Sequence, residues 1–194
     1  MPRTSASLSD ALTNLPLDKG LRKAVERQRD AICDIDMGER DLLSPEQAGP
    51  VSIVERRAIA VYVAALHQER ELVDRYLALL AESDGAGPAL ARVIEAEARR
   101  AAAHHPDPHL PAPASRALIG ERLAVVFAHI QALLTGDRKG QARTLGWSAD
   151  ALGIVSRIMT LVIFQVRMIA GLRQCALARR NVVPLARKGY SHDV

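Results

Sequence analysis

The sequence predicts an all-α fold, and three observations lead to that prediction. Alanine and leucine dominate the 194 residues, and only 3% of them are aromatic. Runs of Val, Ile, Thr and Tyr bounded by turn residues, which would indicate strands, are missing from the sequence. Apolar residues recur instead at helical spacing behind capping signals, and a hydrophobic fraction of 48% is ample for a core.

The stretch 52–82 is the centre of the predicted fold. Ser52, followed three residues later by Glu55, has the pattern of a capping box, so a helix is expected to begin there. Residues 58–66 are apolar or small on every side, which is typical of a helix in the middle of a core. After a polar elbow the apolar residues return on one face only. We therefore expect a buried helix folded back onto an amphipathic partner.

The residues before this stretch predict a helical extension. Ser7 is expected to cap a short helix that stops before Pro16. Asp18 should cap a longer helix that ends at Gly38, a plausible C-cap. Another short helical turn is expected behind Ser44, where proline occupies the first position.

The second half predicts three further helices. Residues 88–103 favour a helix that is mostly exposed, and the four prolines within 104–113 indicate a stiff connector. A helix capped by Ser115 is expected to end at Gly136. The last and longest helix should cover about 149–179, with the residues beyond it frayed.

The distribution of charge, the N-terminal residues and the cysteines argue against nucleic-acid-binding, secreted and membrane proteins. The net charge of +4 comes mostly from the C-terminal end, and no basic face with stacking aromatics accompanies it, so no nucleic-acid partner is expected. The N-terminus lacks the apolar segment of a signal peptide. The stretch 158–172 contains Gln165 and Arg167 and is too short and polar to span a bilayer. Cys33 and Cys175 stand alone, which fits a reducing compartment, so a cytoplasmic location without membrane contact is expected.

One family resemblance rests on the order of the central elements. A capped apolar helix that ends Ala64-Ala65-Leu66, a polar elbow and a second helix resemble the carboxymuconolactone decarboxylase and alkyl hydroperoxidase D superfamily. The peroxidase-related branch continues with signals similar to Ala132-Leu133-Leu134-Thr135 and Leu145-Gly146-Trp147-Ser148, and then with a long apolar helix that contains an arginine. The resemblance covers about 41–177.

The resemblance also shows what this chain lacks. Superfamily members carry a C-x-x-C-x-x-H motif at the elbow, and here those positions are Glu69, Leu72 and Arg75. Two thiols one helical turn apart are needed so that one can resolve a disulfide formed by the other. A carboxylate and a leucine cannot do this, so cysteine-based peroxidase chemistry at the elbow is excluded.

The resemblance implies the following organisation. Residues 41–180 would form one domain of the alkyl hydroperoxidase D type, with 1–40 as a helical extension and 181–194 as a basic flexible tail. Superfamily members usually form trimers or hexamers, so a homo-oligomer is expected.

Candidate catalytic residues lie at the elbow. Glu69, His67 and Arg75 form a polar cluster in which a buried carboxylate of raised pKa, next to a histidine, could act as an acid or base. The alternative is a solvated junction with ordinary helix pairs, such as Glu71 with Arg75. Glu55 lies near the family's proton-relay glutamate. Its capping role explains it, and the alignment of Ala64-Ala65-Leu66 puts Arg57 at the relay position instead.

Candidate ligand-binding residues are Arg167, His129 and Tyr62. Arg167 lies in the most apolar helix, and a buried guanidinium must have an anion or carbonyl groups as partners. Glu55, Glu121 or the carboxylate of a ligand could serve. A ligand would then lie between the central helix pair and residues 164–171. The alternative is that Arg167 and His129 are structural.

No metal and no cofactor are expected. His104, His105, Asp107 and His109 match no standard zinc spacing, and the prolines among them prevent a helical pair of ligands.

Two functions remain open. The first is a superfamily member without redox cysteines that binds a small metabolite or acts as an assembly partner. The second is a cofactor-free enzyme that performs acid–base chemistry on a carboxylated or peroxidic small molecule. An enclosed pocket joining Arg167, His129 and the elbow carboxylates would favour the enzyme, and a filled core with these groups paired would favour the first function.

Overall fold

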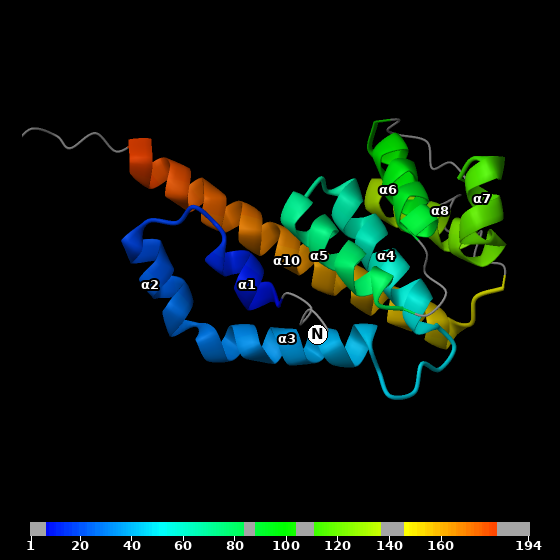
Figure 1. Ribbon diagram of the computed structural model, residues 1–194, viewed down its shortest axis with the longest axis horizontal. Coiled ribbons are helices and arrows are strands. Elements are labelled where there is room, and N and C mark those ends of the chain that lie inside the picture. The colour runs from blue at the N-terminus through cyan, green and yellow to red at the C-terminus, as the bar shows by residue number, and fades with distance from the viewer. Residues whose placement is uncertain (1–6, 84–87, 104–110, 137–145, 182–194) are drawn as a thin grey trace, which may run out of the picture.

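The computed structural model describes residues 7–83, 88–103, 111–136 and 146–181 (Figure 1). The regular elements in these ranges are all α-helices, which confirms the predicted fold class. They are α1 (Leu8–Thr13), α2 (Lys19–Arg27), α3 (Arg29–Leu43), α4 (Ile53–Leu66), α5 (Arg70–Ala81), α6 (Pro88–Ala103), α7 (Pro113–Ile119), α8 (Glu121–Thr135) and α10 (Ala149–Asn181).

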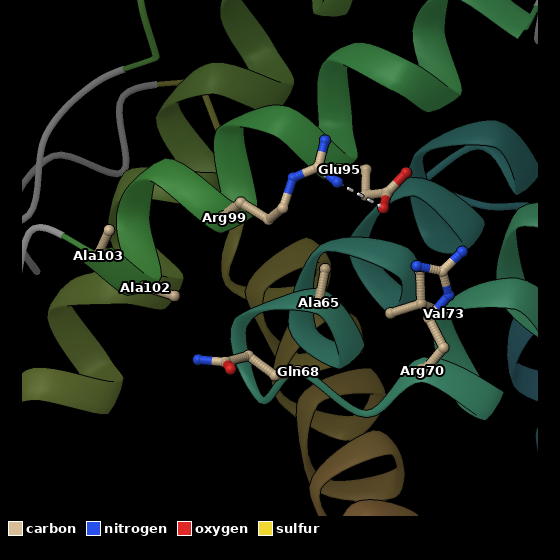
Figure 2. A pocket seen from close by; sticks show the side chains of 8 residues that line it. All are labelled: Ala65, Gln68, Arg70, Val73, Glu95, Arg99, Ala102 and Ala103. Carbon is tan, nitrogen blue, oxygen red and sulfur yellow. Dashed lines mark hydrogen bonds and ion pairs between the residues drawn. The ribbon is translucent and has the colours of Figure 1, made fainter.

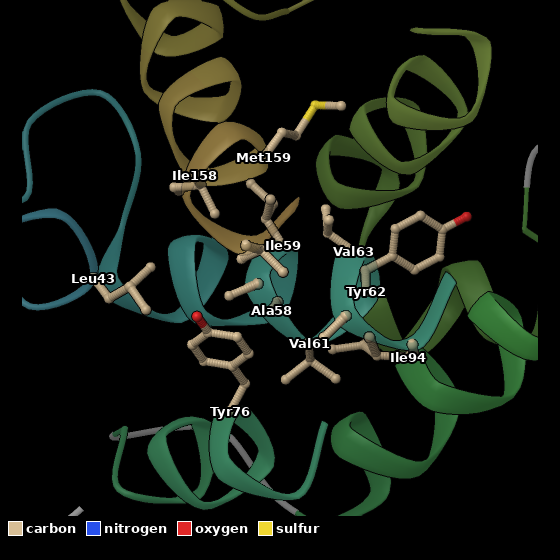
Figure 3. Close-up of a cluster of buried hydrophobic side chains, with 14 of the residues drawn as sticks. Leu43, Ala58, Ile59, Val61, Tyr62, Val63, Tyr76, Ile94, Ile158 and Met159 are labelled. Atoms are coloured by element: carbon tan, nitrogen blue, oxygen red, sulfur yellow. The ribbon is translucent and has the colours of Figure 1, made fainter. Parts of the chain in front are cut away.

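Helix α4 is the centre of the core. Its capping box forms as predicted, because the Ser52 hydroxyl accepts from the Glu55 amide and the Glu55 carboxylate accepts from the Ser52 amide. Every residue from 56 to 65 is buried. Tyr76 of α5, Ile94 of α6 and Ile158 of α10 converge on it from different directions (Figure 3). Because α4 is covered on all sides, no face of it contacts water, which explains why its residues are mostly apolar.

Helix α5 folds back beside α4 as an amphipathic partner. Leu72 and Tyr76 are fully buried on one face, whereas Asp74 and Ala78 are exposed on the other. The reversal occurs at Gln68, which has a φ of 56°. The predicted central pair is therefore confirmed.

The N-terminal helices differ from the prediction in two places. Ser7 and Asp18 cap α1 and α2 as expected, but the chain breaks at Gln28 and begins a new helix, α3. Gly38 lies inside α3 and is not a C-cap. Burial of Leu43, beyond the glycine, outweighs the cost of about 1 kcal/mol for glycine within a helix. The turn predicted behind Ser44 is not helical.

The second half also departs from its predicted boundaries. Ser115 lies within α7 and donates its hydroxyl to Glu97, 2.6 Å away, instead of capping a helix. Gly120, at a φ of 82°, separates α7 from α8, and the two helices meet at 114°. Gly136 ends α8 in the left-handed conformation, as predicted.

Helix α6 is more enclosed than its composition indicates. Ile94 and Ala98 are fully buried and Glu97 is buried beside them, because α6 packs against α4. The other 13 of its 16 residues are half-buried or exposed, so the prediction of a mostly exposed helix fails only on this inner face. Residues 104–110 of the proposed connector lie outside the described ranges.

Helix α10 begins behind Ser148, whose hydroxyl accepts from the Ala151 amide 3.2 Å away. It runs the length of the molecule beneath α4 and α5 (Figure 1). Within the described ranges, Ala149–Arg179 is the single unbroken helix long and apolar enough to cross a membrane. The bent α7–α8 pair also meets these criteria if it is taken as one span. Helix α10 extends beyond 158–172 in both directions, so the prediction that its apolar part is too short and polar to span a bilayer is wrong by these criteria. Core helices of soluble proteins meet the same criteria, so this finding does not locate the chain.

Candidate functional site

The elbow between α4 and α5 is the candidate site. His67 forms the C-cap of α4, and Glu69 takes the N-cap position of α5 without capping it through its side chain. The left-handed backbone of Gln68 between them turns the chain abruptly. As a result His67 is exposed and Glu69 is buried, although the two residues are only two positions apart.

Glu69 belongs to a cluster in which two carboxylates share one guanidinium. Arg173 of α10 donates to both oxygens of Glu69, at 2.7 and 2.9 Å, and also to Glu71. Burial raises the pKa of Glu69, and hydrogen bonding to Glu69 and then to Arg173 lowers the pKa of Glu71 to about 2. The two carboxyl groups are thus driven apart in acidity. Glu71 pairs with Arg173 and not, as the structural alternative assumed, with Arg75.

Arg75 belongs to a separate buried network. Its guanidinium binds Glu39 of α3 with both arms, one at 2.8 Å, and approaches Asp36 at 3.7 Å. Glu39 also accepts from Gln165 of α10 at 2.6 Å and from the Tyr76 hydroxyl at 3.3 Å. The network ties α3, α5 and α10 together. Arg75 is therefore committed to the fold and does not face the other elbow residues as a catalytic partner.

The prediction that Arg167 is buried is wrong. Arg167 is exposed on α10, and the inward-facing polar residue of that helix is Gln165, two positions earlier. The proposed partners are occupied elsewhere, since Glu121 lies 3.5 Å from Arg116 and Glu55 lies 2.6 Å from Arg122. The physical reason is that, among the residues the structure describes, other helices cover only one face of α10.

The other predicted residues lie in different surroundings. Tyr62 is fully buried, its ring stacks on Phe127 with centroids 3.9 Å apart, and its hydroxyl accepts from Gln131. His129 is half-buried on α8. His67 is exposed overall, yet partial desolvation and the charge of Arg167 lower its pKa.

A hollow of about 420 Å³ opens beside the elbow (Figure 2). Ala65 and Val73 contribute apolar surface, and Gln68, Arg70 and Arg99 contribute polar groups. Arg99 donates to Glu95 on the same helix at 3.0 Å. Neither Glu69 nor any of the three predicted ligand-binding residues lines this hollow. The described hollows therefore do not include the enclosed pocket that would join those residues, nor one between the central pair and 164–171.

Within the described ranges no three His, Cys, Asp or Glu residues lie close enough to hold a metal ion. The sequence group His104, His105, Asp107 and His109 lies outside those ranges. Cys33 and Cys175 are exposed free thiols on α3 and α10, away from the elbow in sequence.

Sequence reasoning missed Glu39 and Arg173. Glu39 lies seven residues after Ile32 and four before Leu43, both buried, so helical spacing could have placed it on the inner face. No local pattern distinguishes Arg173 from the other basic residues near the C-terminus.

Comparison with known proteins gave no further identification. No family model, no curated protein and no solved structure matches the chain.

Proposed function

We propose that the chain is a non-redox member of the carboxymuconolactone decarboxylase and alkyl hydroperoxidase D superfamily that binds a small metabolite or acts as an assembly partner. One observation supports this most: the three elbow positions that would carry thiol chemistry all serve the fold. Glu69 is held by Arg173, Leu72 is fully buried, and Arg75 is held by Glu39.

The hollow beside the elbow is the proposed ligand site. Its volume of about 420 Å³ falls within the range of small-molecule sites, about 300–1,000 Å³. The apolar surface of Ala65 and Val73, together with the guanidinium groups of Arg70 and Arg99, suits a small molecule with an apolar body and a carboxylate. Both arginines are exposed, so they can turn toward a ligand at little cost.

A thermal-shift screen of carboxylated metabolites tests this site. Wild-type protein should be stabilised by a ligand, and the Arg99→Ala variant should lose that stabilisation. Arg92→Ala is the matched control, because Arg92 is exposed on the same helix and does not line the hollow. Equal thermal shifts in the wild type and both variants would show that the ligand binds outside this hollow.

A peroxidase assay tests the proposal that the chain has no redox function. Peroxide reduction with a dithiol donor should not exceed the background rate. Robust turnover that persists in a Cys33→Ser, Cys175→Ser double variant would contradict the proposal, because it would reveal peroxidase chemistry of another kind.

A second candidate, a cofactor-free acid–base enzyme, is favoured by the opposite pKa shifts of Glu69 and Glu71. In such an enzyme Glu69 would hold the proton to be transferred. Turnover of a carboxylated or peroxidic compound that falls about 100-fold or more in Glu69→Gln would support this candidate. Unchanged turnover in that variant would exclude it.

We also propose that the chain is a cytoplasmic homo-oligomer, a trimer or hexamer. Phe164 and Leu177 on α10 and Leu133 and Leu134 at the end of α8 are exposed, and only 39% of the most apolar window of α10 is buried. Sedimentation should give a trimer or hexamer, and Phe164→Glu should shift it toward the monomer. A monomer that co-sediments with lipid vesicles would indicate a membrane partner instead.

A further inference from the structure

A second hollow lies at the opposite end of the α4–α5 pair, next to an unusual arginine. Arg57, in the first turns of α4, is only 8% exposed. Its Nη1 donates to the Leu79 carbonyl at 2.5 Å and to the Ser83 hydroxyl at 2.9 Å, and its Nη2 donates to the Ser44 hydroxyl at 2.7 Å. Its Nε is buried and has no hydrogen-bond partner.

The neighbouring Arg56 shows what a satisfied buried arginine looks like in this fold. Its three nitrogens donate to the carbonyls of Val51, Leu42 and Ala48 at 2.9, 2.7 and 2.7 Å. Arg56 therefore closes the loop before α4, and each of its three nitrogens makes a hydrogen bond. Arg57 is also buried on α4 and also makes three hydrogen bonds, but its Nε nitrogen makes none of them.

Arg57 also has no counter-ion within direct reach. Within the described residues no carboxylate oxygen lies within 4.0 Å of its guanidinium. Burial lowers the pKa of Arg57, yet a guanidinium keeps its proton in proteins, so a positive charge remains in the interior. A buried charge is costly. The more distant charge of Glu82 offsets part of that cost, and a bound anion is one way to offset more of it.

The hollow beside Arg57 has a volume of about 260 Å³ and lies between α3, α4 and α5. Six charged side chains line it. Arg75 is paired with Glu39 and Asp36, and these three side chains together carry a charge of −1. Arg57 and Arg40 face one carboxylate, Glu82, so this part of the lining carries a charge of +1, although the six charged side chains together sum to zero.

We propose that this hollow binds a small oxyanion that carries one negative charge, such as the carboxylate of a small metabolite. One oxygen would accept from the unused Nε of Arg57. The Ser44 hydroxyl already accepts from Nη2, so its own proton is available for a second oxygen. The site is separate from the elbow hollow and does not depend on the function proposed there.

The experiment titrates wild-type protein with sodium acetate at constant ionic strength, with chloride as the balancing anion. The Nε–H resonance of Arg57 is followed by ¹H–¹⁵N NMR. A saturable shift with a dissociation constant of about 1 mM is expected. Monobasic phosphate in a parallel titration distinguishes a general oxyanion site from a carboxylate site. Absence of a saturable Arg57 shift with both anions at about 10 mM would overturn the proposal.

Two variants test whether acetate binds at Arg57. Arg57→Gln should bind acetate at least about tenfold more weakly, and Arg56→Gln should bind it as wild type does. If Arg57→Gln does not fold, Arg40→Gln replaces it, because Arg40 is exposed on the rim and its loss should weaken binding about threefold. Acetate affinity that is the same in the folded Arg57→Gln variant, or in Arg40→Gln when it is the substitute, would refute the assignment.

Discussion

The two charged clusters on α5 are built from the same residue types but differ in their access to water. In the inner cluster the side chains of Arg75 and Glu39 are 6% and 4% exposed, and Glu39 accepts from three different residues. In the elbow cluster the side chain of Glu69 is 5% exposed, but those of Arg173 and Glu71 are 34% and 38% exposed. In an enclosed cluster every polar group must find its hydrogen-bond partner within the protein. A cluster at the surface can instead bind water or take up a proton when it loses a partner.

The largest effect is expected from Arg75→Met. Removal of one partner of a buried pair leaves the other charge uncompensated, so the free energy of unfolding should fall by about 3–5 kcal/mol. Urea unfolding followed by circular dichroism measures the change.

The double variant Arg75→Met, Glu39→Met is the control for this prediction. It removes both charges, so it should recover much of the stability lost in the single variant. A single variant as stable as wild type would show that the inner cluster does not hold α3 to α5.

A smaller effect is expected from Arg173→Met. Its loss should cost about 1–2 kcal/mol, because Arg173 is partly exposed and surface pairs contribute little. In addition, Glu69 can bind a proton more readily than an ordinary carboxyl group and so avoid remaining a buried anion. The same urea measurement applies, and a loss as large as that in Arg75→Met would erase the proposed distinction between the clusters.

The elbow cluster should also be visible in the pH dependence of stability. The pKa of Glu71 falls from its ordinary 4.5 to about 2 in the folded protein, so its contribution is present above pH 4.5 and is lost as the pH falls toward 2. The raised pKa of Glu69 acts in the opposite direction at higher pH. The unfolding free energy of Glu71→Gln should therefore fall less than that of wild type between pH 4.5 and 2. Parallel curves would contradict this assignment.

The smallest effect is expected for Arg70→Ala on the outer face of α5. Arg70 pairs with Asp74 at 3.2 Å, but their side chains are largely exposed, so the change should stay within about 0.5 kcal/mol. The same substitution removes one cation from the elbow hollow, so it should reduce the thermal shift that a carboxylated metabolite produces. A smaller thermal shift with an unchanged free energy of unfolding would show that Arg70 contributes to binding and not to stability.

Several parts of the fold could be predicted because their causes are local. Ser7, Asp18 and Ser52 begin helices as expected, since each side chain bonds an amide three residues away. The uniformly apolar run in α4 likewise indicates burial on all sides without reference to any neighbour.

The candidate site could be predicted only in outline. Burial of Glu69 at the elbow agrees with the sequence argument, but its partner Arg173 lies 104 residues away. The apolar neighbours of Arg167 predict that its side chain is buried in the last helix, but in the structure Gln165 faces inward instead.

By itself, then, the sequence determined where most helices begin, which helix is central, and that no thiol stands at the elbow. Tertiary structure decided which charges are buried and with whom they pair. The physical reason is range: a cap is completed within four residues, whereas Glu39 meets Arg75 from 36 residues away and Gln165 from 126. A side chain's solvent exposure depends on which distant helix packs over it, and the residues next to it in the sequence do not predict which helix that is.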